Sequence, residues 1–296
     1  MRHHTTGILL VAVSGASFGA AAVLAKIAYN AGVDPVTLLA VRFAIAALCM
    51  VGVLRLGGHA WPRGRTLLVL VCLGAVCYVT QSMLYFVALT VAPAALVALL
   101  LYVYPAIVMI VAALVFHESL TAVKVIAVVV ALAGTALTIG RASGGSPAGV
   151  ALALGAAVAY AIYILASSRV GPKAGAIPAA TVVMLSAAVV LGIAVSVRGP
   201  ALPQSVGGWA ALVGIALIST VIAIVTFFAG LERVGPAEAS TVSTMEPMTV
   251  VLLAAVVLGE RISTEQIIGG TLIIMAVVLM ARAGRPELVP EDAPPA

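Results

Sequence analysis

The chain has 296 residues, of which 64% are hydrophobic and 8% are charged, and its mean hydropathy is +1.26. Soluble domains are about 45–50% apolar and about 25% charged, so this composition excludes a water-soluble globule and indicates a protein embedded in a bilayer. The net charge is +5, but the basic residues are dispersed between apolar blocks, which argues against a nucleic-acid partner and is typical of charged cytoplasmic loops.

The apolar residues form ten blocks, each close to the roughly 20 residues that a helix needs to cross the hydrocarbon core of a bilayer. The blocks show no period-2 alternation, so strands are not expected. The first block follows MRHHTTG without a small-residue cleavage site, so we expect it to be retained as a helix. The predicted spans are residues 6–28, 35–55, 66–89, 93–116, 121–140, 149–168, 177–197, 208–230, 236–258 and 264–282. The expected fold class is an all-α integral membrane protein with ten transmembrane helices.

Small residues in the first three spans are interpreted as packing elements. Gly15 and Gly19 form a GxxxG pattern, which allows close helix packing within the monomer or a homodimer. Cys49, Cys72 and Cys77 lie inside apolar blocks and are expected to act as small buried hydrophobes, not as a disulfide framework or a metal site.

Two basic side chains lie within spans, Lys26 in the first and Arg42 in the second. Both are near the extracellular ends of their helices, so each could extend its charge to the membrane interface. Arg42 is about seven residues into its span, hence about 10 Å deep at 1.5 Å per residue. At that depth it could pair with Glu246 or meet a substrate carboxylate, and the sequence leaves both alternatives open.

Polar side chains follow helical spacing in the third and sixth spans, and lipid-facing Gln is unfavourable, so we expect both stripes to face inward. An aromatic and hydroxyl lining suits organic solutes better than bare ions. Tyr29 and Tyr102 are instead expected to pack or to lie at the interface. The stripes are Tyr78, Gln81, Ser82 and Tyr85 in the third span, and Tyr160, Tyr163 and Ser167 in the sixth.

Prolines interrupt the fourth and ninth spans. Pro105 and Pro247 are both predicted to kink their helices, and Pro247 would leave the carbonyl of Ser243 without its helical partner. The segment before Pro247 is unusually polar, so its hydroxyls and the freed carbonyl are expected to face water or substrate. These polar residues are Ser240, Thr241, Ser243, Thr244 and Glu246.

Glu246 lies at mid-depth, where an unpaired carboxylate costs a few kcal/mol, so it should face a cavity, pair or stay protonated. One hypothesis makes it a structural clamp or gating residue that holds a kinked helix. The other makes it a substrate contact or a proton relay. We favour the clamp.

The Lys and Arg residues predict the orientation. With the N-terminus in the cytoplasm, ten of them fall inside and three outside, so the positive-inside rule places both termini in the cytoplasm. The inside set is Arg2, Arg55, Arg63, Arg65, Lys124, Arg169, Lys173, Arg233, Arg282 and Arg285, and the outside set is Arg141, Arg198 and Arg261. The tail, residues 283–296, is rich in proline and acidic residues and is expected to be disordered in the cytoplasm.

A shift of 142 residues aligns the chain with itself. Gly7 then falls on Gly149, Pro105 on Pro247, and residues 85–89 on 227–231. Each half, 6–140 and 149–282, holds five predicted helices, and an odd number forces the halves into opposite orientations. The sequence therefore predicts an inverted repeat, an arrangement that secondary transporters use for alternating access.

Further features accompany the two halves. They are the Arg42-Phe43 pair, the aromatic-to-Ala-Leu segment at 85–89, and the segments from Pro105 to Glu118 and from Glu246-Pro247 to Glu260. Together they resemble the EamA-type transporters of the drug/metabolite transporter superfamily, over about residues 7–282. One departure is His117-Glu118, where a Gly-Glu pair would be usual. The resemblance implies transport of a small organic solute, in a family that spans amino acids, other metabolites, drugs and sugar derivatives.

No motif for an enzymatic reaction, a cofactor or a metal is visible. Without a nucleotide-binding domain, transport must run downhill or be coupled to an ion gradient, and proton coupling is one possibility. The leading hypothesis is a secondary transporter in the cytoplasmic membrane that exports an amino acid or a related metabolite. The alternatives are an importer of a sugar-like or nucleoside-like solute and, from another class, an intramembrane sensor or lipid-handling enzyme.

Overall fold

The computed structural model describes residues 2–116, 121–140, 146–168, 174–234, 239 and 242–283, and this part of the chain is helical without strands. The first half contains α1 (Arg2–Asn30), α2 (Pro35–Leu56), α3 (Gly64–Cys72), the π-helical η1 (Leu73–Tyr78), α4 (Val79–Val91), α5 (Ala94–Leu101), α6 (Tyr104–Phe116) and α7 (Ala122–Gly140). The second half contains α8 (Pro147–Ser168), α10 (Ala176–Arg198), α11 (Val206–Ala216), the π-helical η2 (Leu217–Ile222), α12 (Ala223–Val234), α14 (Met245–Leu258) and α15 (Thr264–Ala283).

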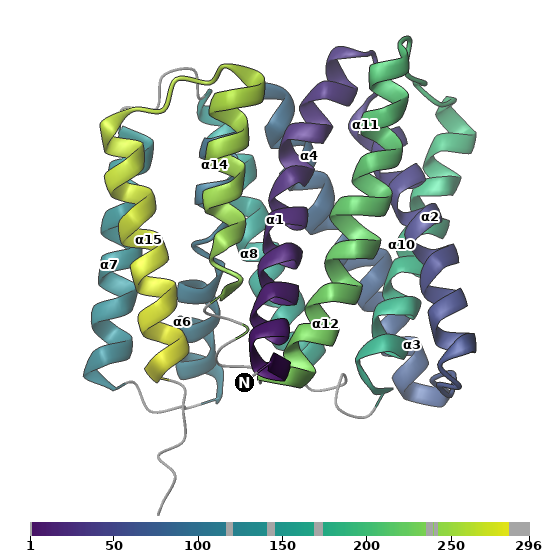
Figure 1. Cartoon of the computed structure of the whole chain (residues 1–296), viewed down its shortest axis with the longest axis horizontal. Helices are drawn as coiled ribbons and strands as arrows, with labels where there is room; N and C mark the ends of the chain where they lie inside the picture. Colours follow the sequence, from purple (N-terminus) through teal and green to yellow (C-terminus); the bar gives the residue numbers. More distant parts are fainter. Residues whose placement is uncertain are drawn as a thin grey trace, which may run out of the picture.

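The helices stand side by side as one upright bundle (Figure 1). Seven of the described helical segments are long and apolar enough to cross a membrane. The other three predicted spans, 121–140, 236–258 and 264–282, contain shorter apolar helices of 10–17 residues. The all-helical class of the prediction is confirmed, and its membrane character is supported by these seven segments.

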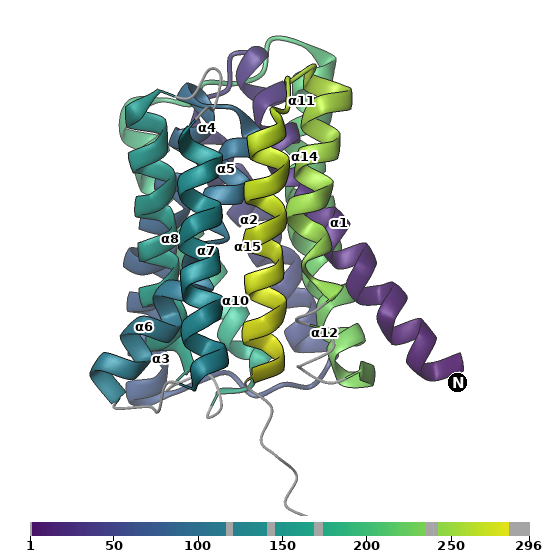
Figure 2. The same ribbon diagram turned by 90° about the vertical axis from the view of Figure 1, so that its left-hand side faces the viewer.

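The two halves pack against each other in matching pairs. α1 packs on α12, and its counterpart α8 packs on α4; α2 packs on α10, and α7 packs on α15. α1 begins at the lower end of the bundle, marked N in Figure 2, whereas α4 reaches the upper end. Ser146, just before α8, donates from its hydroxyl to the carbonyl of Val91 at the end of α4, at 3.0 Å. The first helices of the two halves therefore start at opposite ends of the bundle.

Corresponding helices of the two halves depart from α geometry at corresponding places. The third predicted span, which is built from α3, η1 and α4, carries η1 in its middle. The eighth, which is built from α11, η2 and α12, carries η2. Such short π-helical turns inside α-helices are frequent at functional sites. The fourth predicted span is interrupted at Tyr102–Val103, between α5 and α6.

Both prolines lie in the first turn of a helix, directly after a turn in the chain at residues 102–103 or 243–244. Pro105 is the second residue of α6 and Pro247 the third of α14, within the first turn, where a backbone N–H has no intrahelical partner to lose. The carbonyl of Ser243 is not free either, because it accepts from the N–H of Glu246 at 3.0 Å. The polar residues Ser240 and Thr241, the His117-Glu118 pair, and the predicted tail beyond Ala283 lie outside the described residues.

The two glycines of the GxxxG pattern bring α1 against α14 within the chain. A Cβ atom at Gly19 would lie 2.7 Å from the carbonyl oxygen of Glu246 and 2.8 Å from Cβ of Thr249. A Cβ atom at Gly15 would lie 3.5 Å from the backbone nitrogen of Glu246. The glycines thus set how closely Glu246 approaches α1.

The three cysteines are free thiols, and their predicted burial is wrong for one of them. Cys72 is exposed on the surface of the bundle, whereas Cys49 and Cys77 are partly buried. Cys72 is the last residue of α3.

We expect Gly19→Ala to destabilise the protein, because the added methyl group meets a backbone oxygen that moves only if the first turn of α14 moves. Overpacking of this kind costs about 1–3 kcal/mol. Gly52→Ala is the matched control, since no atom lies within 4 Å of a Cβ there. Thermal unfolding of both purified variants in detergent should show a lower midpoint for Gly19→Ala only, and equal midpoints would contradict the packing.

Candidate functional site

A polar cavity of about 140 Å³ lies between the two halves. Its wall is built from α1, α2, η1, α4, α8 and α14 and from the interruption between α5 and α6. Helix interruptions place polar side chains and helix termini at mid-depth, where they line a cavity instead of lipid. The cavity is therefore the candidate substrate site.

The predicted stripe of the third helix lies along this wall. Tyr78 ends η1, and Gln81, Ser82 and Tyr85 follow in α4, all four lining the cavity. The hydroxyl of Ser82 donates to the side-chain carbonyl of Gln81 at 3.3 Å, which leaves the Gln81 amide group available to a ligand. Gln81 is only 8% exposed, so it faces the cavity and not the lipid.

Aromatic rings form a continuous arc around the cavity. Tyr102 and Tyr104 have ring centroids 6.1 Å apart, and Tyr104 meets Tyr160 edge-on at 4.7 Å. Tyr163 stacks on Tyr160, with ring planes only 7° apart, and contacts Tyr78 at 5.2 Å. Of the two tyrosines predicted in the sixth span, Tyr160 lines the cavity. Tyr163 is not part of the lining and packs against the rings of Tyr160 and Tyr78.

Two tyrosines and two apolar residues of the cavity wall escaped the sequence analysis. Tyr102, expected to pack or to lie at the interface, lines the cavity beside Tyr104. The internal repeat could have identified Tyr104, because the 142-residue shift aligns it with Glu246. Phe18 and Ala21 of α1 complete this side of the wall, and as apolar residues they carried no signal.

Glu246 links the start of α14 to the break between α5 and α6. The hydroxyl of Tyr102 donates to Oε2 of Glu246 at 2.8 Å. Glu246 is the second residue of α14, where the helix dipole favours a negative charge. The neighbouring Ser243 and Thr244 do not line the cavity, and Ser243 donates its hydroxyl to the carbonyl of Ala239 at 2.8 Å.

Arg42 is the cation of the cavity. Its Nε donates to Oγ1 of Thr220 at 2.8 Å, and its guanidinium carbon lies 5.3 Å from the ring centroids of both Phe43 and Phe86. It forms no ion pair with any described residue, so the pairing with Glu246 that the sequence allowed is absent in this conformation. The cavity thus holds a cation and a carboxyl group that do not neutralise each other directly.

Lys26 and Glu260 meet beside the start of α5, at the upper end of the bundle. Gly259 has the left-handed φ of +67° that ends α14 and turns the chain back, as glycine does most easily. Glu260 then accepts from the N–H groups of Ala94 and Ala95 at 2.7 and 3.1 Å, capping α5, and pairs with Lys26 at 3.8 Å. Lys26 therefore has a partner within the protein and does not only extend to the interface.

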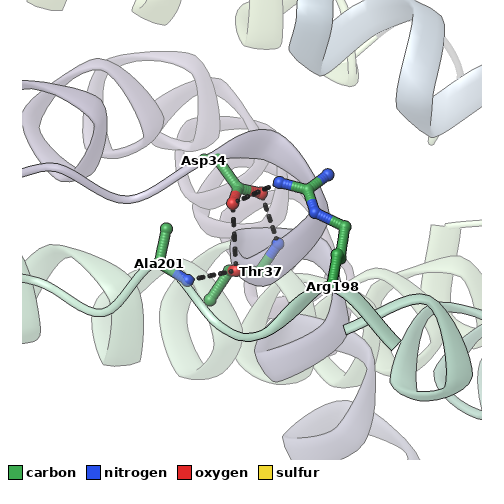
Figure 3. A network of polar contacts seen from close by, with 4 residues as sticks. All are labelled: Asp34, Thr37, Arg198 and Ala201. Carbon is green, nitrogen blue, oxygen red and sulfur yellow. Dashed lines mark hydrogen bonds and ion pairs between the residues drawn. The ribbon is translucent and has the colours of Figure 1, made fainter. Parts of the chain in front are cut away.

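A second network ties the start of α2 to the end of α10 (Figure 3). Asp34 accepts from the N–H of Thr37 at 2.9 Å, as an N-cap does, and from Arg198 at 2.8 Å. The hydroxyl of Thr37 in turn accepts from the N–H of Ala201 at 3.0 Å. Together with the contacts of Glu260, this network cross-links the halves at one end of the bundle.

The lining predicts which positions a water-soluble thiol reagent can reach. In a variant with Cys49, Cys72 and Cys77 replaced by Ala, we expect a cysteine at Gln81 to react readily, since it faces the cavity. A cysteine at Tyr163 should react at least several-fold more slowly, because that position lies behind Tyr160. Leu89→Cys, at a core position, is the unreactive control; equal rates at 81 and 89 would contradict the cavity.

Comparison with known proteins agrees with this architecture. A solved structure described as "Crystal structure of protein" superposes with a TM-score of 0.67 at 22% identity, over 94% of this chain and 98% of that chain. At this identity the likeness shows the fold alone. None of the curated proteins matches the sequence. The EamA-like transporter family matches twice, at residues 5–140 and 147–282, which confirms the resemblance drawn from the motifs. The chain belongs to the EamA-like transporter family.

Proposed function

We propose that the chain is a secondary transporter that exports an amino acid or a closely related metabolite across the cytoplasmic membrane by alternating access. The observation that carries this proposal is the cavity itself, which holds Arg42 as a cation without an ion-pair partner among the described residues, within an aromatic wall. Family membership supports small-molecule transport, and Arg42 supports a solute that carries a carboxylate.

The chemistry of the cavity suits a small organic solute that carries a carboxylate. A guanidinium is the residue of choice for binding a carboxylate with two parallel hydrogen bonds. The tyrosine rings supply contact area for an apolar side chain. Water occupies about 30 Å³ per molecule in the liquid, so the cavity of about 140 Å³ has room for a solute of several non-hydrogen atoms.

Alternating access would use the two halves as an inverted repeat of five transmembrane helices each, residues 6–140 and 149–282. The opposite starting ends of α1 and α8 support this arrangement. The distribution of Lys and Arg supports cytoplasmic termini, and the cross-linked upper end of the bundle would then face outward.

Export is tested by comparing the metabolites in the medium of cells with and without overexpression of the chain. Fusion of green fluorescent protein after Arg285 reports the amount of protein and, because this reporter fluoresces only in the cytoplasm, the side of the C-terminus. We expect fluorescent cells and several-fold more of one or a few amino acids in the medium. Unchanged media at equal fluorescence would contradict export, and a dark fusion would contradict the orientation.

For Glu246 the proposed role is a clamp between α14 and the interrupted fourth helix. Glu246→Gln keeps an oxygen that can accept from Tyr102 but removes the titratable proton. We therefore expect near-normal transport in proteoliposomes for Glu246→Gln and a loss of tenfold or so for Glu246→Ala, since one hydrogen bond to a charged group contributes about 1.5–3 kcal/mol.

Tyr102→Phe tests the same contact from the other side, and its effect should not add to that of Glu246→Ala. Tyr29→Phe is the control, because its hydroxyl donates instead to the carbonyl of Phe86 at 3.0 Å. A proton relay predicts the opposite result for Glu246→Gln. That variant would lose gradient-driven transport and keep exchange at equal pH on both sides.

A further inference from the structure

Thr220 lies in the π-helical turn η2, and its hydroxyl has a defined direction. Oγ1 donates to the carbonyl of Ile215, five residues earlier, at 3.0 Å. A hydroxyl has one hydrogen to donate, so its remaining hydrogen-bonding capacity is as an acceptor. The donor that it receives is Nε of Arg42, 2.8 Å away and 178 residues earlier in the chain.

The surroundings leave the guanidinium of Arg42 little freedom. Thr220 is 1% exposed and Arg42 7%, so the hydrogen bond between them is shielded from water. The rings of Phe43 and Phe86, both 5.3 Å from the guanidinium carbon, restrict its remaining rotation. Since Nε is occupied, the four N–H groups of the two terminal nitrogens remain for other partners, and Arg42 lines the cavity.

We propose that Thr220 is a positioning residue: it holds the guanidinium of Arg42 so that the terminal nitrogens receive the carboxylate of the transported solute. The proposal rests on the proposed function for the identity of the solute, but not for the existence of the anion site. It also couples the two halves, because Arg42 belongs to the first half and Thr220 to the second. A group fixed in its binding geometry loses less entropy when the ligand arrives, and affinity rises accordingly.

A structural role alone would explain the hydrogen bond differently, as the partner that a buried cation needs. The two roles differ in what they predict for a bound anion. A partner needed only for burial would affect stability and leave the affinity of the folded protein for a carboxylate unchanged. A positioning residue would affect that affinity in protein that is still folded.

The experiment uses the full-length protein with ¹⁵N-labelled arginine in lipid nanodiscs. The Nε–H resonance of Arg42 is assigned by its loss in Arg42→Lys. Sodium acetate is the probe, because it is the smallest organic carboxylate after formate; acetamide at equal concentration controls for the uncharged shape and sodium chloride for ionic strength. We expect a saturable shift with acetate and none with the two controls.

The variants separate the roles. Thr220→Ser keeps the hydroxyl and should bind acetate as the wild type does. Thr220→Val keeps the shape without the acceptor and should bind about tenfold more weakly, the loss expected for one hydrogen bond to a charged group. Thr226→Val is the matched control, because the hydroxyl of Thr226 bonds only within its own helix, to the carbonyls of Ile222 and Ala223 at 2.7 and 3.3 Å.

Wild-type affinity in folded Thr220→Val would overturn the proposal, and so would weak binding by Thr220→Ser. Thr220→Ala replaces Thr220→Val if thermal unfolding shows that the valine variant does not fold. Failure of the proposed function looks different. Wild-type proteoliposomes would then move no amino acid, while the acetate titrations still ranked the Thr220 variants as described.

Discussion

Within a bilayer, a helix that stops must find partners inside the protein for the backbone groups that it leaves free. The arrangement of this chain follows from that constraint. α5 begins at Ala94, directly after Pro93, and has its first N–H groups capped by the carboxylate of Glu260, from the other half. The break between α5 and α6 is held by Tyr102, whose hydroxyl reaches Glu246 at the start of α14. In both places, a side chain of the second half meets an interruption of the first half.

The same constraint explains why the charged groups are few and specific. Arg42 is held by a threonine and two aromatic rings, and Glu246 by a tyrosine and a helix N-terminus. These partners are mostly neutral, so they satisfy the charges without cancelling them. An Arg–Glu ion pair would have left no free cation for a charged solute to bind. Charges that are supported yet not neutralised are what distinguish a binding cavity from a structural ion pair.

Periodicity predicted the helical class and the residues of the third-helix stripe, because side chains three and four apart share a face whatever lies around them. It could not identify the helix breaks. Proline has the same local signature in a kink and in the first turn of a new helix, and only the turns at residues 102–103 and 243–244 place these prolines in the second setting. The partners of Tyr102, Thr220 and Glu260 lie 144, 178 and 166 residues away, beyond any local pattern. The repeat offers part of that information, since it aligns Tyr104 with Glu246.

The cap on α5 has a consequence for the synthesis of the protein. The N–H groups of Ala94 and Ala95 enter the membrane early, but the carboxylate that accepts from them is translated 166 residues after Ala94. Until then the first half carries two unsatisfied donors at the start of a short helix, and water or a lipid headgroup must take the place of Glu260. We expect that end of the first half to stay near the wet surface of the bilayer until Glu260 is in place. The capping of α5 is complete only after α14 has been synthesised. The folding of the first half therefore depends on the second half.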